Sequence, residues 1–251
     1  LVVQKNTATS HVGGGVYLQN EGSTFTATGN STRVTVESNT AGQAGGGVYS
    51  AFGADVMVES GAALVVQNNT ATSYYGGGVY LQDEGSTFTA TGNSTHVMIE
   101  SNTAGQIGGG MFSKSGADVM VENGAALVVQ INTATSYYGG GVYLESEGST
   151  FTATGNSTRV TVESNTAGQR GGGVSSFGGA DVMVENGAAL VVRKNTAASQ
   201  FGGGVYFASE GTTFTASGSS TRVSVESNTA GQKGGGMFSL SGADVMVESG
   251  A

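Results

Sequence analysis

The same sequence returns at every 63rd position of the chain, and this self-similarity restricts its fold more than any other feature. Phe25, Asp55 and Met57 each recur at this spacing. Four copies fill the chain, as residues 1–63, 64–126, 127–189 and 190–251. Near-identical units bury their apolar faces by stacking on one another, rather than by folding around a single globular core. We therefore expect residues 1–251 to form a single solenoid, a slice of a longer array.

Each copy consists of two shorter units. The tripeptide Asn-Thr-Ala recurs with steps in residue number that alternate between 33 and 30, and three consecutive glycines follow it six or seven residues later. The recurring asparagines are Asn6, Asn39, Asn69, Asn102, Asn132, Asn165, Asn195 and Asn228. We therefore expect eight coils, each of about 30 to about 33 residues, with two coils in every repeat.

One coil contains three short runs that are typical of strands. In the first coil they are residues 15–18, 24–28 and 33–37, which are rich in Val, Thr and aromatic residues and bounded by Gly, Asn and Ser. In the third run Val34 and Val36 alternate with Arg33, Thr35 and Glu37, so that one face of the strand is apolar. No apolar stripe at helical spacing competes with this pattern.

These features predict an all-β chain that coils as a right-handed parallel β-helix with three short strands per coil. Each strand stacks on its counterpart one coil later, and connections between parallel strands favour the right-handed coil. With strands ~4.8 Å apart, eight coils form a rod of roughly 38 Å, and each two-coil repeat adds roughly 9.6 Å.

The recurring Asn and Gly residues have structural interpretations. Stacked Asn amides in a turn can hydrogen-bond from coil to coil and satisfy polar groups that the turn leaves unpaired. The triple glycines permit positive φ or a close approach of the backbone to packed neighbours. A phosphate-binding loop would need a following helix and usually a Lys, and the sequence predicts neither at these positions.

A four-residue motif that ends in Asn, followed by a glycine block, resembles the repeats of chlamydial polymorphic outer membrane proteins. The chain carries the motif at residues 3–6 (Val-Gln-Lys-Asn) and 36–39 (Val-Glu-Ser-Asn), with Gly-Gly-Gly-Val and Gly-Gly-Gly-Met blocks later. The family's repeats begin with Phe and have Ala as the third block residue, where this chain has Val or Ile and Gly. The resemblance implies right-handed β-helices of the pectin-lyase-like type, surface exposure and an adhesin function.

Charge and composition exclude several partners. Nine Lys and Arg against 18 Asp and Glu give a formal charge of −9, and the basic residues are scattered. Binding to a nucleic-acid backbone needs clustered Lys and Arg, so we expect no nucleic-acid partner. No window approaches the roughly 20 apolar residues of a membrane-spanning helix, so we expect no membrane-spanning segment. The absence of Cys excludes disulfides and thiolate metal ligands.

The titratable residues indicate that the chain is not an enzyme. A polysaccharide-processing site on a β-helix would gather carboxylates with Lys, Arg or His in one groove, and it would interrupt the repeat. Here Asp55 and Glu59 recur in each copy, and His11 and His96 occupy non-equivalent positions. We therefore expect no catalytic residues and no cofactor, and a polysaccharide-processing enzyme is a less favoured alternative.

Two further surfaces are minor alternatives. Stacked acids in adjacent coils, ~4.8 Å apart, would repel one another, and bound Ca²⁺ would ease this repulsion, although no Asp-rich calcium loop is present. Thr24, Thr26 and Thr28 point one way and could order water as ice-binding proteins do, but such a row recurs only in alternate coils. The secondary expectations are therefore that Ca²⁺ weakly stabilises the rod and, separately, that the threonine face binds ice.

Glycosylation sequons recur at the same place in three copies. They begin at Asn30, Asn93 and Asn156, each in the turn expected between the second and third strands, and Asn68 begins a fourth. In the last copy the site is Ser219-Ser220-Thr221. A Gly-Asn-Ser turn needs no glycan to explain it, but glycans at these residues would form a row along an exposed fibre.

Aromatic residues vary between copies just before the glycines. Tyr74, Tyr75, Tyr137, Tyr138 and Phe201 lie there in the second to fourth copies. We expect these turns to stack on one edge, where exposed rings could contact a neighbouring rod or a ligand. Relaxed constraint at a turn explains the variation more simply.

The expected function is structural: a repeat segment of an extracellular filament, shaft or cell-surface fibre that supplies length and stiffness. Near-identical copies and the lack of any copy-specific reactive group favour this interpretation. The alternative is an adhesin that binds a surface glycan or a receptor through the variable aromatic turns. The expected partners are copies of the chain itself, end to end or side by side.

Overall fold

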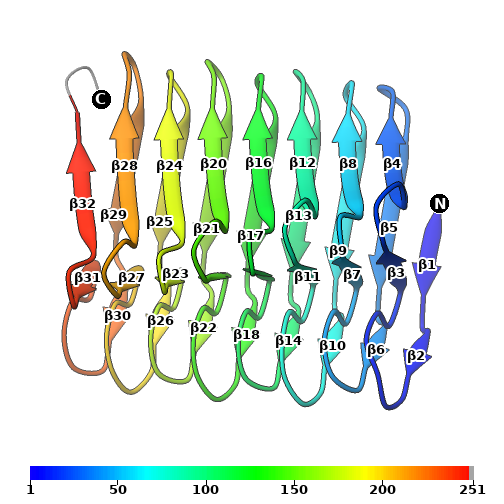
Figure 1. Ribbon diagram of the computed structural model, residues 1–251, viewed down its shortest axis with the longest axis horizontal. Coiled ribbons are helices and arrows are strands. Elements are labelled where there is room, and N and C mark those ends of the chain that lie inside the picture. The colour runs from blue at the N-terminus through cyan, green and yellow to red at the C-terminus, as the bar shows by residue number, and fades with distance from the viewer. Residues whose placement is uncertain (249–251) are drawn as a thin grey trace.

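The computed structural model describes residues 1–248, and the last three residues of the fourth repeat lie outside the described residues. The described chain consists of strands and turns, wound into coils that stack along one axis from the N-terminus to the C-terminal end (Figure 1). The strands form four sheets of eight strands each, here called A to D in the order in which a coil passes through them. All pairings between neighbouring strands are parallel, so the predicted parallel solenoid of eight coils is confirmed.

Sheets A and D contain the five-residue strands. Sheet A consists of β1 (Val2–Gln4), β5 (Arg33–Glu37), β9 (Ala63–Gln67), β13 (His96–Glu100), β17 (Ala126–Gln130), β21 (Arg159–Glu163), β25 (Ala189–Arg193) and β29 (Arg222–Glu226). Sheet D consists of β4 (Thr24–Thr28), β8 (Asp55–Glu59), β12 (Thr87–Thr91), β16 (Asp118–Glu122), β20 (Thr150–Thr154), β24 (Asp181–Glu185), β28 (Thr213–Ser217) and β32 (Asp244–Val247).

Sheets B and C contain shorter strands. Sheet C consists of β3 (Val16–Gln19), β7 (Val48–Ala51), β11 (Val79–Gln82), β15 (Met111–Lys114), β19 (Val142–Glu145), β23 (Val174–Phe177), β27 (Val205–Ala208) and β31 (Met237–Leu240). Sheet B consists of β2 (Thr7–Ala8), β6 (Thr40–Ala41), β10 (Thr70–Ala71), β14 (Thr103–Ala104), β18 (Thr133–Ala134), β22 (Thr166–Ala167), β26 (Thr196–Ala197) and β30 (Thr229–Ala230). The three strands expected in each coil match sheets A, C and D, and sheet B is a fourth that the sequence did not predict.

The main core lies between the sheets and follows the predicted alternation. In β5, Val34 and Val36 are buried, and in β8, Val56 and Val58 are buried, while their neighbours face outward. The same inward positions form one continuous apolar cluster from the first coil to the last described coil. Each coil is thus stabilised mainly by burial of Val, Leu, Ile and Phe against the coils above and below.

A second core lies outside sheet C, and the sequence did not predict it. Tyr49, Tyr80, Phe112 and Tyr143 are buried there although they point away from the main core. The chain between sheets B and C folds over them and contributes Ala44, together with partly buried Val12, Tyr75, Ile107 and Tyr138. The coils between Ala44 and Tyr143 therefore have two buried layers, one inside the solenoid and one beneath this loop.

The glycine triplets are required where adjacent coils approach most closely. The first glycine of each triplet has positive φ, as at Gly139, where φ is 63°. A Cβ at the third glycine, Gly141, would lie 2.6 Å from the carbonyl oxygen of Gly173 and 2.9 Å from Nδ2 of Asn165. These contacts are shorter than any real Cβ makes. Both predicted roles of the glycines, positive φ and close approach, are therefore present in the same triplet.

Candidate functional site

The eight recurring asparagines form one continuous ladder. The backbone N–H and Nδ2 of Asn39 both donate to Oδ1 of Asn69, at 2.9 and 3.0 Å. Nδ2 of Asn69 also donates to the carbonyl oxygen of Val36, at 2.9 Å. The pattern repeats along the stack, and the six inner asparagines, Asn39, Asn69, Asn102, Asn132, Asn165 and Asn195, are fully buried.

The residue before each ladder Asn adopts a left-handed conformation that points the amide inward. Its φ lies between 55° and 57° at Lys5, Asn68, Ile131 and Lys194, and the four intervening coils have Ser at this position. Asn tolerates this conformation better than a β-branched residue such as Ile131 does. The candidate glycosylation residue Asn68 belongs to this turn and is exposed.

The other three candidate glycosylation residues lie in the turn between sheets D and A. Asn30, Asn93 and Asn156 are exposed, while the threonine that completes each sequon is not. Thr95 is 1 % exposed, and its hydroxyl donates to the carbonyl oxygen of Thr91 and accepts from the Gly61 N–H, at 2.8 and 3.0 Å. The threonine thus has a role in the turn that needs no glycan, which also explains why Thr221 is retained where the fourth copy lacks the Asn.

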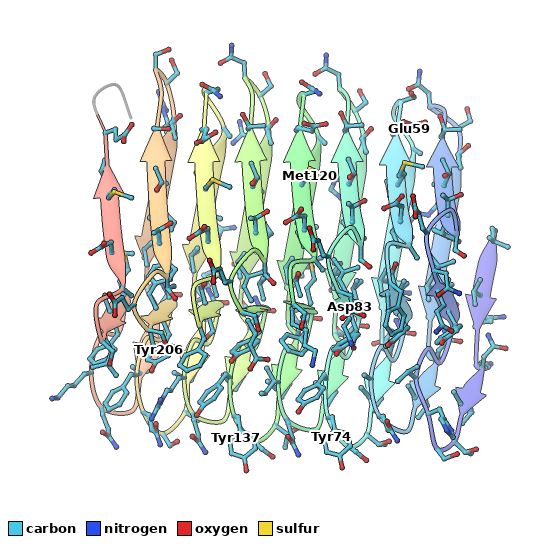
Figure 2. All side chains as sticks on the ribbon, viewed as in Figure 1. Glu59, Tyr74, Asp83, Met120, Tyr137 and Tyr206 are labelled. Carbon is cyan, nitrogen blue, oxygen red and sulfur yellow. The ribbon has the colours of Figure 1, made fainter. Side chains whose placement is uncertain are left out.

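The variable aromatic residues occupy two different environments. Tyr74 and Tyr137 are 43 % and 40 % exposed and lie at the outer edge of the turn between sheets B and C (Figure 2). Tyr75, Tyr138 and Phe201, in contrast, are half-buried and pack on the rings of the second core. Only two of the five candidate contact residues are therefore exposed to a partner.

One coil breaks the aromatic stack of the second core. The position that holds Tyr143 in one coil and Tyr206 two coils later holds Ser175 between them. The Arg170 side chain lies over this gap, and its Cζ is 5.4 Å from the ring centres of both Tyr138 and Tyr206. Such cation–π contacts are favourable when the guanidinium is partly desolvated. The Ser175 hydroxyl is buried and makes no hydrogen bond.

Burial changes the acidity of the phenols in this layer. It raises the pKa of Tyr80 and of Tyr143 above their usual range, because a phenolate would be poorly solvated there, and nearby Glu145 adds to the effect. These phenols are therefore neutral over the physiological range, and their role is in packing rather than in acid–base chemistry.

The acidic residues of sheet D do not stack on one another, contrary to the prediction. Asp55 is in register with Thr24 and Thr87, and Glu59 is in register with Thr28 and Thr91. Acids in the same row are thus two coils, or about 9.6 Å, apart. The Thr87 hydroxyl also donates to Oδ1 of Asp55 at 2.7 Å. The prediction that acids in adjacent coils repel one another is therefore wrong. Stabilisation by Ca²⁺ stays a prediction, but relief of this repulsion no longer supports it.

The two histidines lie apart in the fold. His11 is exposed between sheets B and C of the first coil, with Nδ1 3.1 Å from the Ser10 hydroxyl. His96 lies on the outer side of β13 in sheet A. Among residues 1–248, no group of three His, Asp or Glu side chains is arranged to hold a metal ion.

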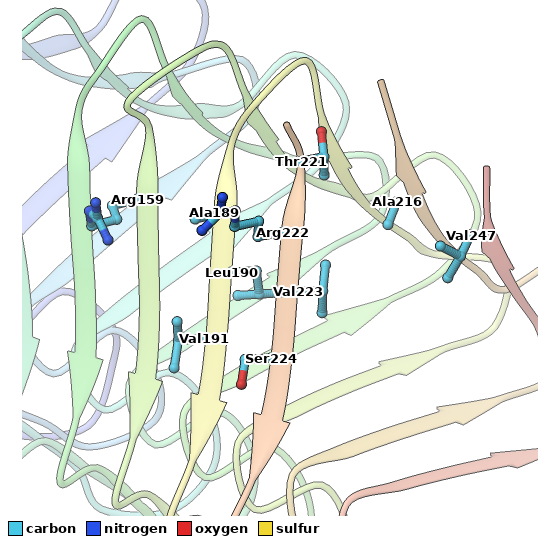
Figure 3. Close-up of a pocket in the computed structure, with 10 residues that line it drawn as sticks. All are labelled: Arg159, Ala189, Leu190, Val191, Ala216, Thr221, Arg222, Val223, Ser224 and Val247. Carbon is cyan, nitrogen blue, oxygen red and sulfur yellow. The ribbon is translucent and has the colours of Figure 1, made fainter. Parts of the chain in front are cut away.

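A hollow of about 570 Å³ opens at the C-terminal end of the stack (Figure 3). Its lining includes Leu190 and Val223, which belong to the inner row of sheet A, and Val247 of β32. Equivalent residues in earlier coils are covered by the coil that follows. The hollow is therefore the uncovered side of the last described coil rather than a site built for a ligand.

The comparisons with known proteins agree with this architecture. A family model described as "Right handed beta helix region" matches residues 56–230, which is well over half of the chain. No curated protein and no solved structure matches the chain. The described residues include no helix long and apolar enough to cross a membrane. With its parallel coils, buried Asn ladder and matching family model, the chain belongs to the right-handed β-helix family.

Proposed function

We propose that this chain is a structural segment of an extracellular filament, shaft or cell-surface fibre, in which stacked coils provide length and stiffness. The observation that carries the proposal is the uninterrupted Asn ladder. It links every coil to the next by side-chain and backbone hydrogen bonds, from Asn6 to Asn228. A rod held together in this way resists bending because each coil is fixed to both neighbours.

The surface chemistry supports a structural role over a catalytic one. The acids of sheet D recur with the repeat and pair with threonines in the coils beside them, as Asp55 does with Thr87. A formal charge of −9 spread along the rod favours solubility at the cell surface. No enzyme activity is part of the proposal.

The test combines dimensions with location. Small-angle scattering of the chain, and of a variant that lacks residues 64–126, should give two rods whose lengths differ by about 9.6 Å. Antibodies against the chain should label the surface of intact cells along thin projections. Labelling that appears only after the cells are permeabilised, or a compact particle of unchanged length, would contradict the proposal.

A second candidate, an adhesin, is favoured by the exposed rings of Tyr74 and Tyr137. These rings occupy the same position in two successive repeats and lie two coils apart along one edge of the rod (Figure 2). The resemblance to chlamydial surface repeats points in the same direction. Binding to a glycan array that disappears in Tyr74→Ala with Tyr137→Ala would favour it. The matched control is Phe52→Ala with Phe177→Ala, which removes similarly exposed rings from the C-terminal edge of sheet C.

A further inference from the structure

The outer face of sheet A carries charges of opposite sign along its two edges. In every second coil the strand has a basic residue at its first position and Glu at its fifth. The pairs are Arg33 and Glu37, His96 and Glu100, Arg159 and Glu163, and Arg222 and Glu226. Because side chains alternate along a strand, both residues of a pair face outward, while Val34 and Val36 of β5 lie in the core.

The intervening strands have Ala at the first position, and β9 and β17 have Gln at the fifth, whereas β25 has Arg193 there, in register between Glu163 and Glu226. Ala63 lies in register between Arg33 and His96, and Gln67 lies between Glu37 and Glu100. Figure 3 shows the same arrangement farther along, with Arg159, Ala189 and Arg222 at one level on three successive strands. Each small Ala leaves room between two long basic side chains.

A central row of uncharged, mostly apolar residues separates the two charged edges. It contains Val2, Thr35, Val65, Met98, Val128, Thr161, Val191 and Ser224, which follow one another in register across the sheet. A flat row of this kind between charged edges is the arrangement found in protein interfaces, where a dry centre is bordered by polar groups.

Most of these charges have no partner of opposite sign within the chain. Over residues 1–248, the ion pairs formed are those of Glu163 with Arg193 and with Lys194, at 2.7 and 3.0 Å. Arg33, Arg159 and Arg222 take part in neither. Glu37 accepts a hydrogen bond of 2.7 Å from Nε2 of Gln67, which orients its carboxylate but leaves its charge uncompensated.

We infer that the outer face of sheet A binds the same face of a second copy of this chain, with the two rods parallel and related by a two-fold axis along the stack. This inference rests on the proposed structural function and names the contact by which rods associate sideways. The rotation reverses the strand direction while it keeps every coil at its level. Arg33 then faces Glu37 of the second copy, Glu37 faces its Arg33, and Ala63 faces its Gln67.

The antiparallel arrangement of the two rods is disfavoured by the same charges. A two-fold axis along the strands sets the first residues of the strands against one another. With the stacks fully overlapped, Arg33 lies opposite Ala189 of the second copy, and with a shift of one coil it lies opposite Arg159 or Arg222, so it gains no acidic partner in either register. The parallel arrangement does pair Arg33 with an acid, and the charge pattern therefore favours parallel rods.

The area of the face is sufficient for a weak but specific contact. Seven strands of five residues and one of three cover at most about 38 by 16 Å, or roughly 600 Å² on each copy. The total of roughly 1,200 Å² lies at the lower end of the range for specific interfaces. Every additional repeat would extend the contact, because the axis runs along the stack.

Charge-reversal sets in the 251-residue chain test the inference by sedimentation at low ionic strength. The acidic set is Arg33→Glu with Arg222→Glu, and the basic set is Glu37→Arg with Glu226→Arg. Each set alone should weaken self-association by about tenfold or more, because like charges then face each other. A mixture of the two sets should associate again, and so should the chain that carries all four substitutions. The matched control on sheet D, Glu59→Arg with Glu122→Arg, should associate as the unchanged chain does.

The possible results separate this inference from the proposed function. Self-association that is unaffected by the sheet A sets but lost in the sheet D control would assign the contact to sheet D and overturn the inference. Self-association that no set changes would indicate stacking of rod ends and would also overturn it, as would a chain that stays monomeric. In all three cases small-angle scattering would still report a rod. The structural function is therefore tested separately, by scattering and surface labelling.

Discussion

The guanidinium of Arg170 donates a hydrogen bond of 3.0 Å to the hydroxyl of Tyr206 and lies 5.4 Å from the centre of that ring. A long charged residue thus fills the space that Ser175 leaves in a row otherwise occupied by Tyr and Phe. The equivalent pair two repeats earlier has the sizes reversed, with Ala44 in the loop and Tyr49 in the row. At these two sites a large side chain in one row compensates for a small one in the other.

This compensation predicts that the two positions are coupled. Arg170→Ala should reduce the free energy of unfolding by about 1–3 kcal/mol, because the rings of Tyr138 and Tyr206 lose their partner. Ser175→Tyr should also destabilise, because Arg170 occupies the space. The double variant recreates the pair formed by Ala44 and Tyr49, and chemical denaturation should show it to be more stable than either single variant. Simple additivity of the two effects would contradict the compensation.

The third glycine of each triplet is tightly packed inside the stack but not at its C-terminal end. Comparing the same substitution at the two places tests whether this packing requires Gly. A Cβ at Gly141 would meet the carbonyl oxygen of Gly173 at 2.6 Å, whereas a Cβ at Gly236 would meet only Val225, at 3.7 Å. Gly141→Ala should therefore destabilise by about 3 kcal/mol or more. Gly236→Ala should be neutral or stabilise by up to about 1 kcal/mol, because it restricts the unfolded chain. Equal thermal shifts for the two variants would show that close approach does not determine the choice of Gly.

The buried ladder predicts a large difference between two substitutions of Asn by Asp. In the ladder, Asn132→Asp removes the donor to the carbonyl oxygen of Ile99 and buries a carboxylate, so a loss of about 3–5 kcal/mol is expected. Asn68→Asp introduces the same charge at an exposed turn, where the change should stay within about 0.5 kcal/mol. Urea denaturation of both variants at neutral pH measures this difference, and similar midpoints would mean that the ladder contributes little.

The sequence predicted sheets A, C and D because their strands have clear boundaries and alternating residues, as in Arg33 to Glu37. It missed sheet B, since Thr40 and Ala41 are too short a run to show alternation. It also missed the second core. Tyr49 follows a glycine triplet and has the pattern of a strand residue, but the loop that covers it has no periodic pattern, and burial depends on contacts between distant parts of the coil. The Asn ladder was predicted because every coil repeats it.

The second core also predicts that the rod loses stability in alkali. Burial holds the pKa of Tyr143 above its unfolded value of 10.0, so the phenol contributes its full stability below about pH 10. Above that pH the unfolded chain releases the proton while the folded chain keeps it. The free energy of unfolding should then fall by about 1.4 kcal/mol per pH unit for each such tyrosine. Tyr143→Phe preserves the ring, as Phe112 does in the coil before it, and should flatten this decline when urea denaturation is measured between pH 9 and 12, whereas the exposed Tyr74→Phe should not.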